Sequence, residues 1–132
     1  MIREISIQTG KRAEFIDITD TISRVLEASR VQEGICIVWV PHTTAGVTVN
    51  ENADPDVVRD ILTETEKFIP VQDGYRHREG NSAAHIKSSL FGPQLTLVVT
   101  GGHLLLGTWQ SVYFCEFDGP RNRRFSVKIV EA

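Results

Sequence analysis

Two of the four histidines in the chain lie in one short stretch, YRHREGNSAAHIK, at residues 75 to 87. His77 falls in a predicted loop, and His85 falls in the first turn of a predicted helix. The positive end of a helix disfavours an imidazolium, so we expect His85 to stay neutral, the form that binds a metal or accepts a proton. This stretch is therefore a candidate for one half of a chemical site.

A third histidine, His42, follows Pro41 at the end of the apolar run ICIVWVP, where strand ends deliver side chains to a cleft. Three histidines are enough ligands for a divalent metal with an open coordination position, and imidazole ligands suit zinc most often. Their spacing does not show that they converge, and it matches neither HExxH nor CxxC. The alternative is that they are scattered surface or capping histidines. His103, in a GGH turn, is interpreted as an exposed turn residue.

Acids and amides are grouped in the run VNENADPD, between a predicted strand and a predicted helix. Glu51 and Asn52 precede the helix cap and are more polar than a turn requires, so each is a candidate contact for a metal or a substrate. Asp54 has a simpler interpretation as the N-cap, because Pro55 suits the first helical position. On the sequence alone, both interpretations of Asp54 stay open.

Two segments have the features of an anion site. Glu79 and Asn81 lie just before a predicted helix whose first turn, with Ser82, presents free backbone N–H groups to a phosphate or carboxylate. In HTTAG, Thr43 and Thr44 offer hydroxyls beside a flexible backbone that can approach an anion closely. The alternative for HTTAG is a plain hairpin turn.

The runs GTWQ and DGPRNRR contain the remaining candidates. Trp109 beside Gln110 pairs an aromatic plane with an amide that can read a heterocycle, although a tryptophan in a strand is more often part of a core or an interface. Arg121, Arg123 and Arg124 could each clamp a phosphate with two parallel hydrogen bonds. Equally, these arginines could form a solvated turn or pair with acids across a subunit boundary.

The elements that must position these residues follow from hydrophobic periodicity, which predicts one compact α+β domain over residues 1–132. We expect eight or nine strands in mixed or antiparallel sheets. REISIQT and FIDIT are interpreted as an opening hairpin, and ICIVWVP as a central strand covered on both faces. Helices are predicted in DTISRVLEASRVQEG, closed by Gly34, in NADPDVVRDILTETEKF, and from Asn81 or Ser82 to Leu90. The loop between the last two helices is of a length that is more often functional than idle.

Composition excludes several classes of function. With 41% hydrophobic residues and a formal net charge of -3, the chain has no broad basic face for nonspecific binding of nucleic acid. No apolar run approaches the length of a membrane span, and MIREISIQTG lacks the apolar centre of a signal peptide. We therefore expect a cytoplasmic protein without nucleic-acid or membrane partners. Cys36 and Cys115 lie in apolar strands and are interpreted as small buried hydrophobic residues.

Three long motifs together carry a resemblance to a known family: PHTTAGVTVNENADPDVVRDI, HREGNSAAHIKSSLFG and LLLGTWQSVYFCEFDGPR. They resemble the YjbQ family, also called the secondary thiamine-phosphate synthase family. The resemblance implies a compact α+β fold that forms a homotrimer, with a site near the subunit boundaries. It further implies that His42, His77 and His85 are metal ligands. The polar positions around them are Glu51, Asn52, Asp54, Glu79 and Asn81, whose three carboxylates we assign catalytic roles.

The activity that the resemblance implies is weak thiamine-phosphate synthesis from a pyrimidine diphosphate and a thiazole phosphate. Departing pyrophosphate needs groups that neutralise its charge, and a divalent metal, Arg121, the Thr43–Thr44 turn and the helix start at Asn81 and Ser82 could supply them. Zinc is the expected metal, with magnesium or manganese as alternatives for a diphosphate substrate. Because 132 residues cannot build a TIM barrel, the mechanism of the usual barrel enzyme does not transfer.

Two other functions stay open on the sequence. One is a metal-dependent hydrolase of a small phosphorylated or acylated molecule, in which three histidines hold a metal whose bound water attacks. The other is a noncatalytic trimeric protein whose histidines hold a structural metal or a ligand.

Overall fold

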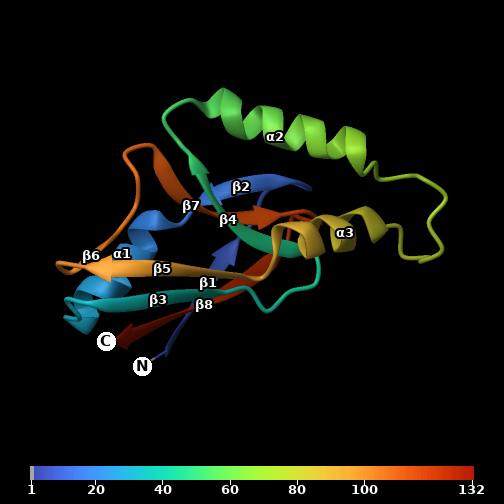
Figure 1. Cartoon of the computed structure of the whole chain (residues 1–132). Coiled ribbons are helices and arrows are strands. Elements are labelled where there is room, and N and C mark those ends of the chain that lie inside the picture. The colour runs from blue at the N-terminus through green and yellow to red at the C-terminus, as the bar shows by residue number, and fades with distance from the viewer. Residues whose placement is uncertain (1) are drawn as a thin grey trace.

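The computed structural model describes residues 2–132, which fold into two β-sheets and three helices (Figure 1). The strands are β1 (Ile2–Gln8), β2 (Glu14–Asp17), β3 (Gly34–Trp39), β4 (Ala45–Glu51), β5 (Gln94–Thr100), β6 (His103–Leu104), β7 (Gln110–Glu116) and β8 (Asn122–Glu131). The helices are α1 (Thr19–Ser29), α2 (Pro55–Phe68) and α3 (Ser82–Phe91). The larger sheet has the order β1-β8-β3-β5-β6 and the smaller has the order β2-β7-β4. Every strand pair in the described residues is antiparallel.

The main hydrophobic core lies between the two sheets, where alternate residues of each strand point inward. α1 contributes two fully buried residues, Ile22 and Leu26, to this core. The sheets contribute Cys36, Val38, Val47, Val99, Val112, Phe114, Phe125 and Val127. The two sheets and α1 therefore enclose one continuous apolar interior.

α2 and α3 lie on the outer face of the smaller sheet and form a third layer (Figure 1). A second apolar cluster joins Ala84 of α3 to Tyr113, Cys115 and Phe117, with Val58 of α2 packed against it. α2 begins as its sequence predicts, because the Asp54 side chain accepts a hydrogen bond from the Asp56 N–H at 2.9 Å. In the described residues, no helix is long and apolar enough to cross a membrane.

An ion pair fastens the two outer helices to each other. The Lys87 side chain in α3 is only 2% exposed, and its Nζ lies 2.7 Å from Glu66 Oε2 in α2. Glu66 also meets Arg12, from the turn between β1 and β2, at 3.0 Å. The helix that carries His85 is therefore held from its outer side by α2.

Several predictions about the fold are confirmed: the α+β class, the three helices, the helix start at Ser82 and the burial of both cysteines. The opening hairpin is wrong, since β1 pairs with β8 and β2 pairs with β7, in different sheets. The first helix ends earlier than predicted, because Arg30 takes a left-handed conformation and caps α1.

Two further predictions about strands need correction. β3 is central in its sheet, but in this chain its outer face is open to solvent at Trp39, which is 46% exposed. Polar Thr96 and Ser126 flank that face on neighbouring strands, so the apolar run of β3 does not by itself indicate cover on both sides. His103 is exposed, as predicted, but belongs to the short strand β6 instead of a turn.

Candidate functional site

A polar cavity of about 490 Å³ lies where four segments of the chain meet. These are the loop after β3, the loop before α3, the first turns of α3, and the turn between β7 and β8 with the start of β8. The lining residues are Pro41, His42, Thr43, Thr44, His77, Glu79, Asn81, His85, Asp118, Arg121 and Arg123. The structure thus brings together the three histidines that were singled out in the sequence, although they come from distant segments.

α3 is fixed against β4 at one side of this cavity. The Ser88 hydroxyl donates to the Ala45 carbonyl at 2.6 Å, and Val47 N–H donates to the Gly92 carbonyl at 3.1 Å. Gly46 permits this close approach, because a Cβ atom at this position would lie 2.9 Å from the Gly92 oxygen. These contacts hold the helix that presents His85 beside the loop that contains His42.

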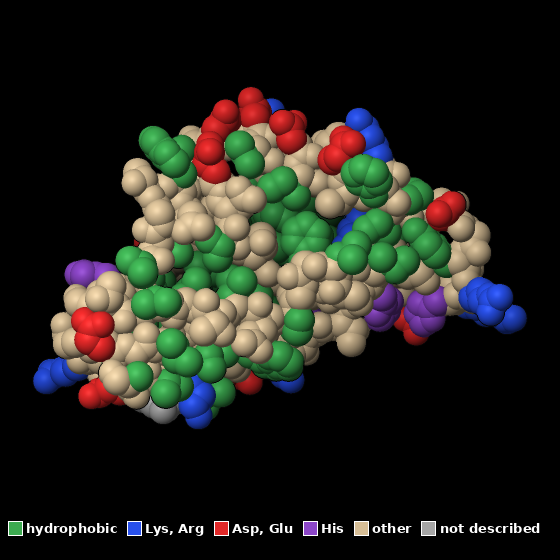
Figure 2. Space-filling view, in the orientation of Figure 1, with side chains coloured by type: hydrophobic (Ala, Val, Ile, Leu, Met, Phe, Trp, Pro, Cys, Tyr) green, Lys and Arg blue, Asp and Glu red, His purple; other side chains and the backbone are tan. Residues whose placement is uncertain are grey.

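His77 and His85 form a pair at the rim of the cavity. Their ring centroids are 5.5 Å apart and the rings are nearly perpendicular, at 86°. Glu79 lies close to His77, with its Oε2 atom 3.9 Å from Nε2 of that histidine. Figure 2 shows histidine side chains at the surface below α3, beside hydrophobic side chains of the same region. Two imidazoles and a carboxylate at these distances can bind an anion, relay a proton or share a cation.

His42 is held by the backbone of β8. Its Nε2 atom lies 3.0 Å from the Arg124 N–H nitrogen and 3.1 Å from the Arg124 carbonyl oxygen. In one tautomer Nε2 accepts a hydrogen bond from the Arg124 N–H, and in the other tautomer it donates to the Arg124 carbonyl. Either contact leaves Nδ1 as the ring nitrogen available to a ligand. Burial and the neighbouring Arg123 charge lower the pKa of His42, which keeps the ring neutral at pH 7.

The donors around the cavity are not arranged as a metal centre within one chain. The described residues contain no group of three or more His, Cys, Asp or Glu side chains placed to hold a metal ion. As arranged in one chain, the three histidines therefore do not form the predicted ligand set, and a zinc ion would require side chains to move. Zinc, magnesium or manganese binding stays a prediction for this cavity.

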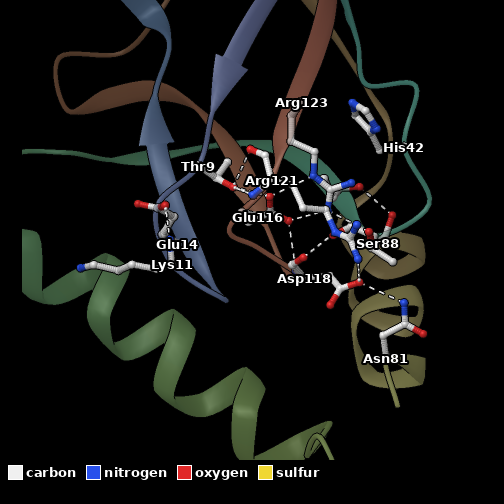
Figure 3. A network of polar contacts seen from close by, with 12 residues as sticks. Thr9, Lys11, Glu14, His42, Asn81, Ser88, Glu116, Asp118, Arg121 and Arg123 are labelled. Carbon is white, nitrogen blue, oxygen red and sulfur yellow. Dashed lines mark hydrogen bonds and ion pairs between the residues drawn. The ribbon is translucent and has the colours of Figure 1, made fainter. Parts of the chain in front are cut away.

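Asp118 connects two walls of the cavity (Figure 3). One oxygen, Oδ2, accepts from Asn81 Nδ2 at 2.9 Å and from Arg121 Nη2 at 3.0 Å. Arg121 also donates from Nε to the Asp118 carbonyl at 2.7 Å, which orients its guanidinium. Sequence reasoning missed Asp118 because a DGPR turn explains an aspartate without any functional role.

Asn81 occupies the N-cap position of α3, but its side chain makes no capping hydrogen bond. Its Nδ2 atom donates a hydrogen bond to Asp118 instead. Its buried Oδ1 atom has no hydrogen-bond partner among the described residues. Buried polar atoms are usually paired, so this unpaired acceptor, on a residue that lines the cavity, is an exception among the described residues.

A buried ion pair forms the floor of the cavity. Glu116 is fully buried, and its Oε1 atom lies 2.9 Å from Nε of Arg123. The Thr9 hydroxyl donates to the same oxygen at 2.7 Å, and the Asp118 N–H donates to Oε2 at 3.0 Å. Arg123 in turn donates to the Thr44 hydroxyl oxygen at 2.8 Å (Figure 3). Of the alternatives for Arg123, the structure therefore favours pairing with an acid, here within the same chain.

Five predicted site residues lie elsewhere, near the other end of β4. Ala45 borders the cavity region and Glu51 ends the strand, which places the two about 20 Å apart at the usual rise per strand residue. At that far end, the Asn52 side chain donates to Asp17 and its N–H donates to the Trp109 carbonyl. The single chain therefore does not bring the following residues to the histidines: Glu51, Asn52, Asp54, Trp109 and Gln110.

The comparison with known proteins identifies the family. The sequence pattern of the family described as UPF0047 protein YjbQ-like matches residues 3–132. The chain belongs to the YjbQ family. It is 51% identical over 130 residues to the UPF0047 protein MJ1081 of Methanocaldococcus jannaschii, covering 98% of this chain and 94% of that protein. It is 47% identical to the UPF0047 protein YugU of Bacillus subtilis, covering 98% of this chain and 99% of YugU.

Solved structures of YjbQ proteins share the fold. A crystal structure of a YjbQ/UPF0047 family protein from Clostridium acetobutylicum superposes with a TM-score of 0.96 at 51% identity, covering 97% of this chain and 99% of that one. A YbjQ-like protein from Sulfolobus solfataricus superposes with a TM-score of 0.96 at 32% identity, covering 100% and 97%. The names of these relatives state no activity.

Proposed function

We propose that this YjbQ protein binds a small phosphorylated molecule in the cavity of His42, His77 and His85. The observation that carries the proposal is the convergence of three imidazoles with the guanidinium of Arg121 in one cavity. Arg121 is oriented by Asp118 yet remains 52% exposed, so it can meet a phosphate oxygen. Thr43 also lines the cavity and adds a hydroxyl.

The reaction we propose for this cavity is the weak thiamine-phosphate synthesis expected from the family resemblance. The thiazole nitrogen attacks the methylene carbon of the pyrimidine diphosphate, a C–N bond forms, and the C–O bond breaks to release pyrophosphate. Arg121 neutralises the departing charge, because a cation positioned where charge develops lowers the barrier. His77 and His85 form hydrogen bonds to the leaving group. Of the three carboxylates predicted to be catalytic, Glu79 is the one that lines this cavity.

The test is an assay of thiamine phosphate formation from both precursors by the purified protein. His77→Ala and Arg121→Ala should each lower the rate by about a hundredfold, as losses of positioned acid-base and electrostatic groups do. His103→Ala is the matched control, since His103 is exposed on β6 and does not line the cavity. Undiminished synthesis by His77→Ala would refute the assignment of the site.

We further propose a homotrimer in which one subunit supplies Glu51 and Asn52 to the histidine cavity of another. Apolar residues are exposed near both ends of the third layer and its sheet, with Leu90 71% and Trp109 62% exposed. A head-to-tail contact joins two different surfaces of neighbouring subunits. Such a contact closes into a ring of three when each subunit is rotated by one third of a turn relative to the next.

This assembly is tested by mass in solution and by mixing. His77→Ala and Glu51→Ala subunits, each inactive alone, should recover part of the activity after co-assembly, because some boundaries then contain both intact halves. A monomeric mass, or mixtures that stay inactive, would show that the two groups do not cooperate.

A second candidate is a metal-dependent hydrolase, which the proximity of His77 to both Glu79 and His85 favours. In that case phosphate release from a panel of phosphorylated substrates should depend on zinc or manganese and stop with a chelator. The products separate the two candidates: the transferase forms thiamine phosphate from both precursors, whereas the hydrolase releases phosphate only when its metal is present.

A further inference from the structure

A second cavity, of about 380 Å³, adjoins the polar one on the side of α3. It lies between the loop before α3 and the first turns of that helix. Its lining residues are Tyr75, Arg76, His77, Ser82, His85 and Ile86. His77 and His85 line both cavities, so the histidine pair forms a shared wall between them.

The two cavities differ in chemistry. The polar cavity contains two arginines and two carboxylates. The lining surface of the adjoining one is mostly apolar and contains no carboxylate: Tyr75 and Ile86 lie there beside Arg76, Ser82 and the two histidines. The Tyr75 hydroxyl donates to the Pro70 carbonyl at 2.7 Å, which satisfies its polar end and fixes the ring. Ile86 is 39% exposed, so its side chain is available to a ligand.

Trp109 was the residue expected to contact the organic part of a substrate. Its backbone carbonyl accepts from Asn52, at the end of β4 remote from the histidines, and Trp109 lines neither cavity. Within one chain, the apolar surface next to the anion cavity is therefore that of Tyr75 and Ile86.

We propose that the adjoining cavity is a subsite, here called the Tyr75–Ile86 subsite, for the organic group of a phosphate ester whose anionic end lies beside Arg121. This inference rests on the proposed phosphate binding and adds to it a requirement for a ring-sized apolar group. Each cavity falls within the 300–1,000 Å³ typical of small-molecule sites. Two adjacent cavities, one polar and one apolar, match the two ends of an amphiphilic phosphate ester and not inorganic phosphate alone.

The experiment compares three probes by isothermal titration calorimetry: inorganic phosphate, methyl phosphate and benzyl phosphate. We expect benzyl phosphate to bind about tenfold more tightly than methyl phosphate, because apolar surface removed from water adds to affinity in proportion to its area. Ile86→Ser should abolish this difference while leaving the affinity for methyl phosphate unchanged. Ile86 is partly exposed, so the variant should fold.

Phe68→Ser is the matched control, because Phe68 is exposed at the end of α2 and lines neither cavity. It should keep the tenfold preference for benzyl phosphate. Arg121→Ala should weaken all three probes by a similar factor, since Arg121 contacts only the anionic end.

The outcomes separate this inference from the proposed function. If all three phosphates bind equally well, or if Phe68→Ser removes the preference as fully as Ile86→Ser, the subsite is refuted and phosphate binding stands. If none of the probes binds, the proposed function fails and the subsite fails with it.

Discussion

Replacement of Glu116 by glutamine should destabilise the fold strongly, because it leaves the guanidinium of Arg123 buried without a negative partner. The side chains of this pair are 0% and 6% exposed, so solvent can do little to compensate. Breaking a buried ion pair by removing one partner costs about 3–5 kcal/mol. Glutamine has one acceptor oxygen, so it can accept from the Thr9 hydroxyl or from the Asp118 N–H but not from both. We therefore expect the free energy of unfolding to fall by about 4 kcal/mol, in the middle of that range.

The assay is urea unfolding at pH 7, followed by circular dichroism, with Glu64→Gln as the matched control. Glu64 makes an exposed pair with Lys67 on α2, at 3.4 Å, and exposed pairs contribute little to stability. The control should therefore unfold almost as the unmodified protein does. A loss below about 1 kcal/mol for Glu116→Gln would refute the argument that the carboxylate neutralises a buried charge.

The same variant should change the response of the protein to acid. Burial alone would raise the pKa of Glu116, but hydrogen bonds from Arg123, Thr9 and the Asp118 N–H outweigh it and hold the pKa below its ordinary 4.5. A carboxylate with a lowered folded-state pKa stabilises the fold above its unfolded-state pKa and loses that effect as the pH falls through the folded value. The difference in stability between the two proteins should be constant from pH 7 to about pH 5 and shrink below about pH 4.5.

Three further predictions concern other contacts. Arg121→Ala should weaken binding of inorganic phosphate at least tenfold in calorimetry, while Arg59→Ala, on the exposed side of α2, should not. Glu66→Ala should lower the free energy of unfolding in urea by about 2 kcal/mol, because buried Lys87 loses its ion-pair partner. The loss stays moderate because Glu66 itself is 37% exposed. His42 should titrate below 6.5 by NMR, and His42→Asn should make stability less sensitive to acidification below that pH, since protonation of a histidine with a lowered pKa opposes folding.

The sequence predicts local structure well where one segment contains the whole signal. Asp54 and Pro55 begin α2 as expected, because an N-cap depends on residues that are adjacent in the chain. The pairing of strands is harder to predict. In both β1 and β2 polar and apolar residues alternate as in a strand, but which strand each one pairs with depends on which sheet buries its apolar face. That choice separates them, and the hairpin prediction fails.

The candidate site shows the same division. The spacing of the histidines in the sequence did not show whether they lie close together in the fold. The expectation that His42 meets His77 and His85 came from the resemblance to a family. Glu116 and Asp118 were missed because one lies in an apolar strand and the other in an ordinary turn. Their importance comes from partners far away in sequence, such as Thr9, which lies 107 residues from Glu116.

The buried network under the cavity also has a consequence for the order of events in folding. The hydrogen bond from the Arg121 N–H to the Thr9 hydroxyl closes a separation of 112 residues, and β8, which follows it, pairs with both β1 and β3. Contacts of such high sequence separation form late, because the entropy of closing the loop must be overcome first. On a ribosome, the cavity cannot be assembled until β8 has emerged, so its walls come together only after the other strands have been synthesised.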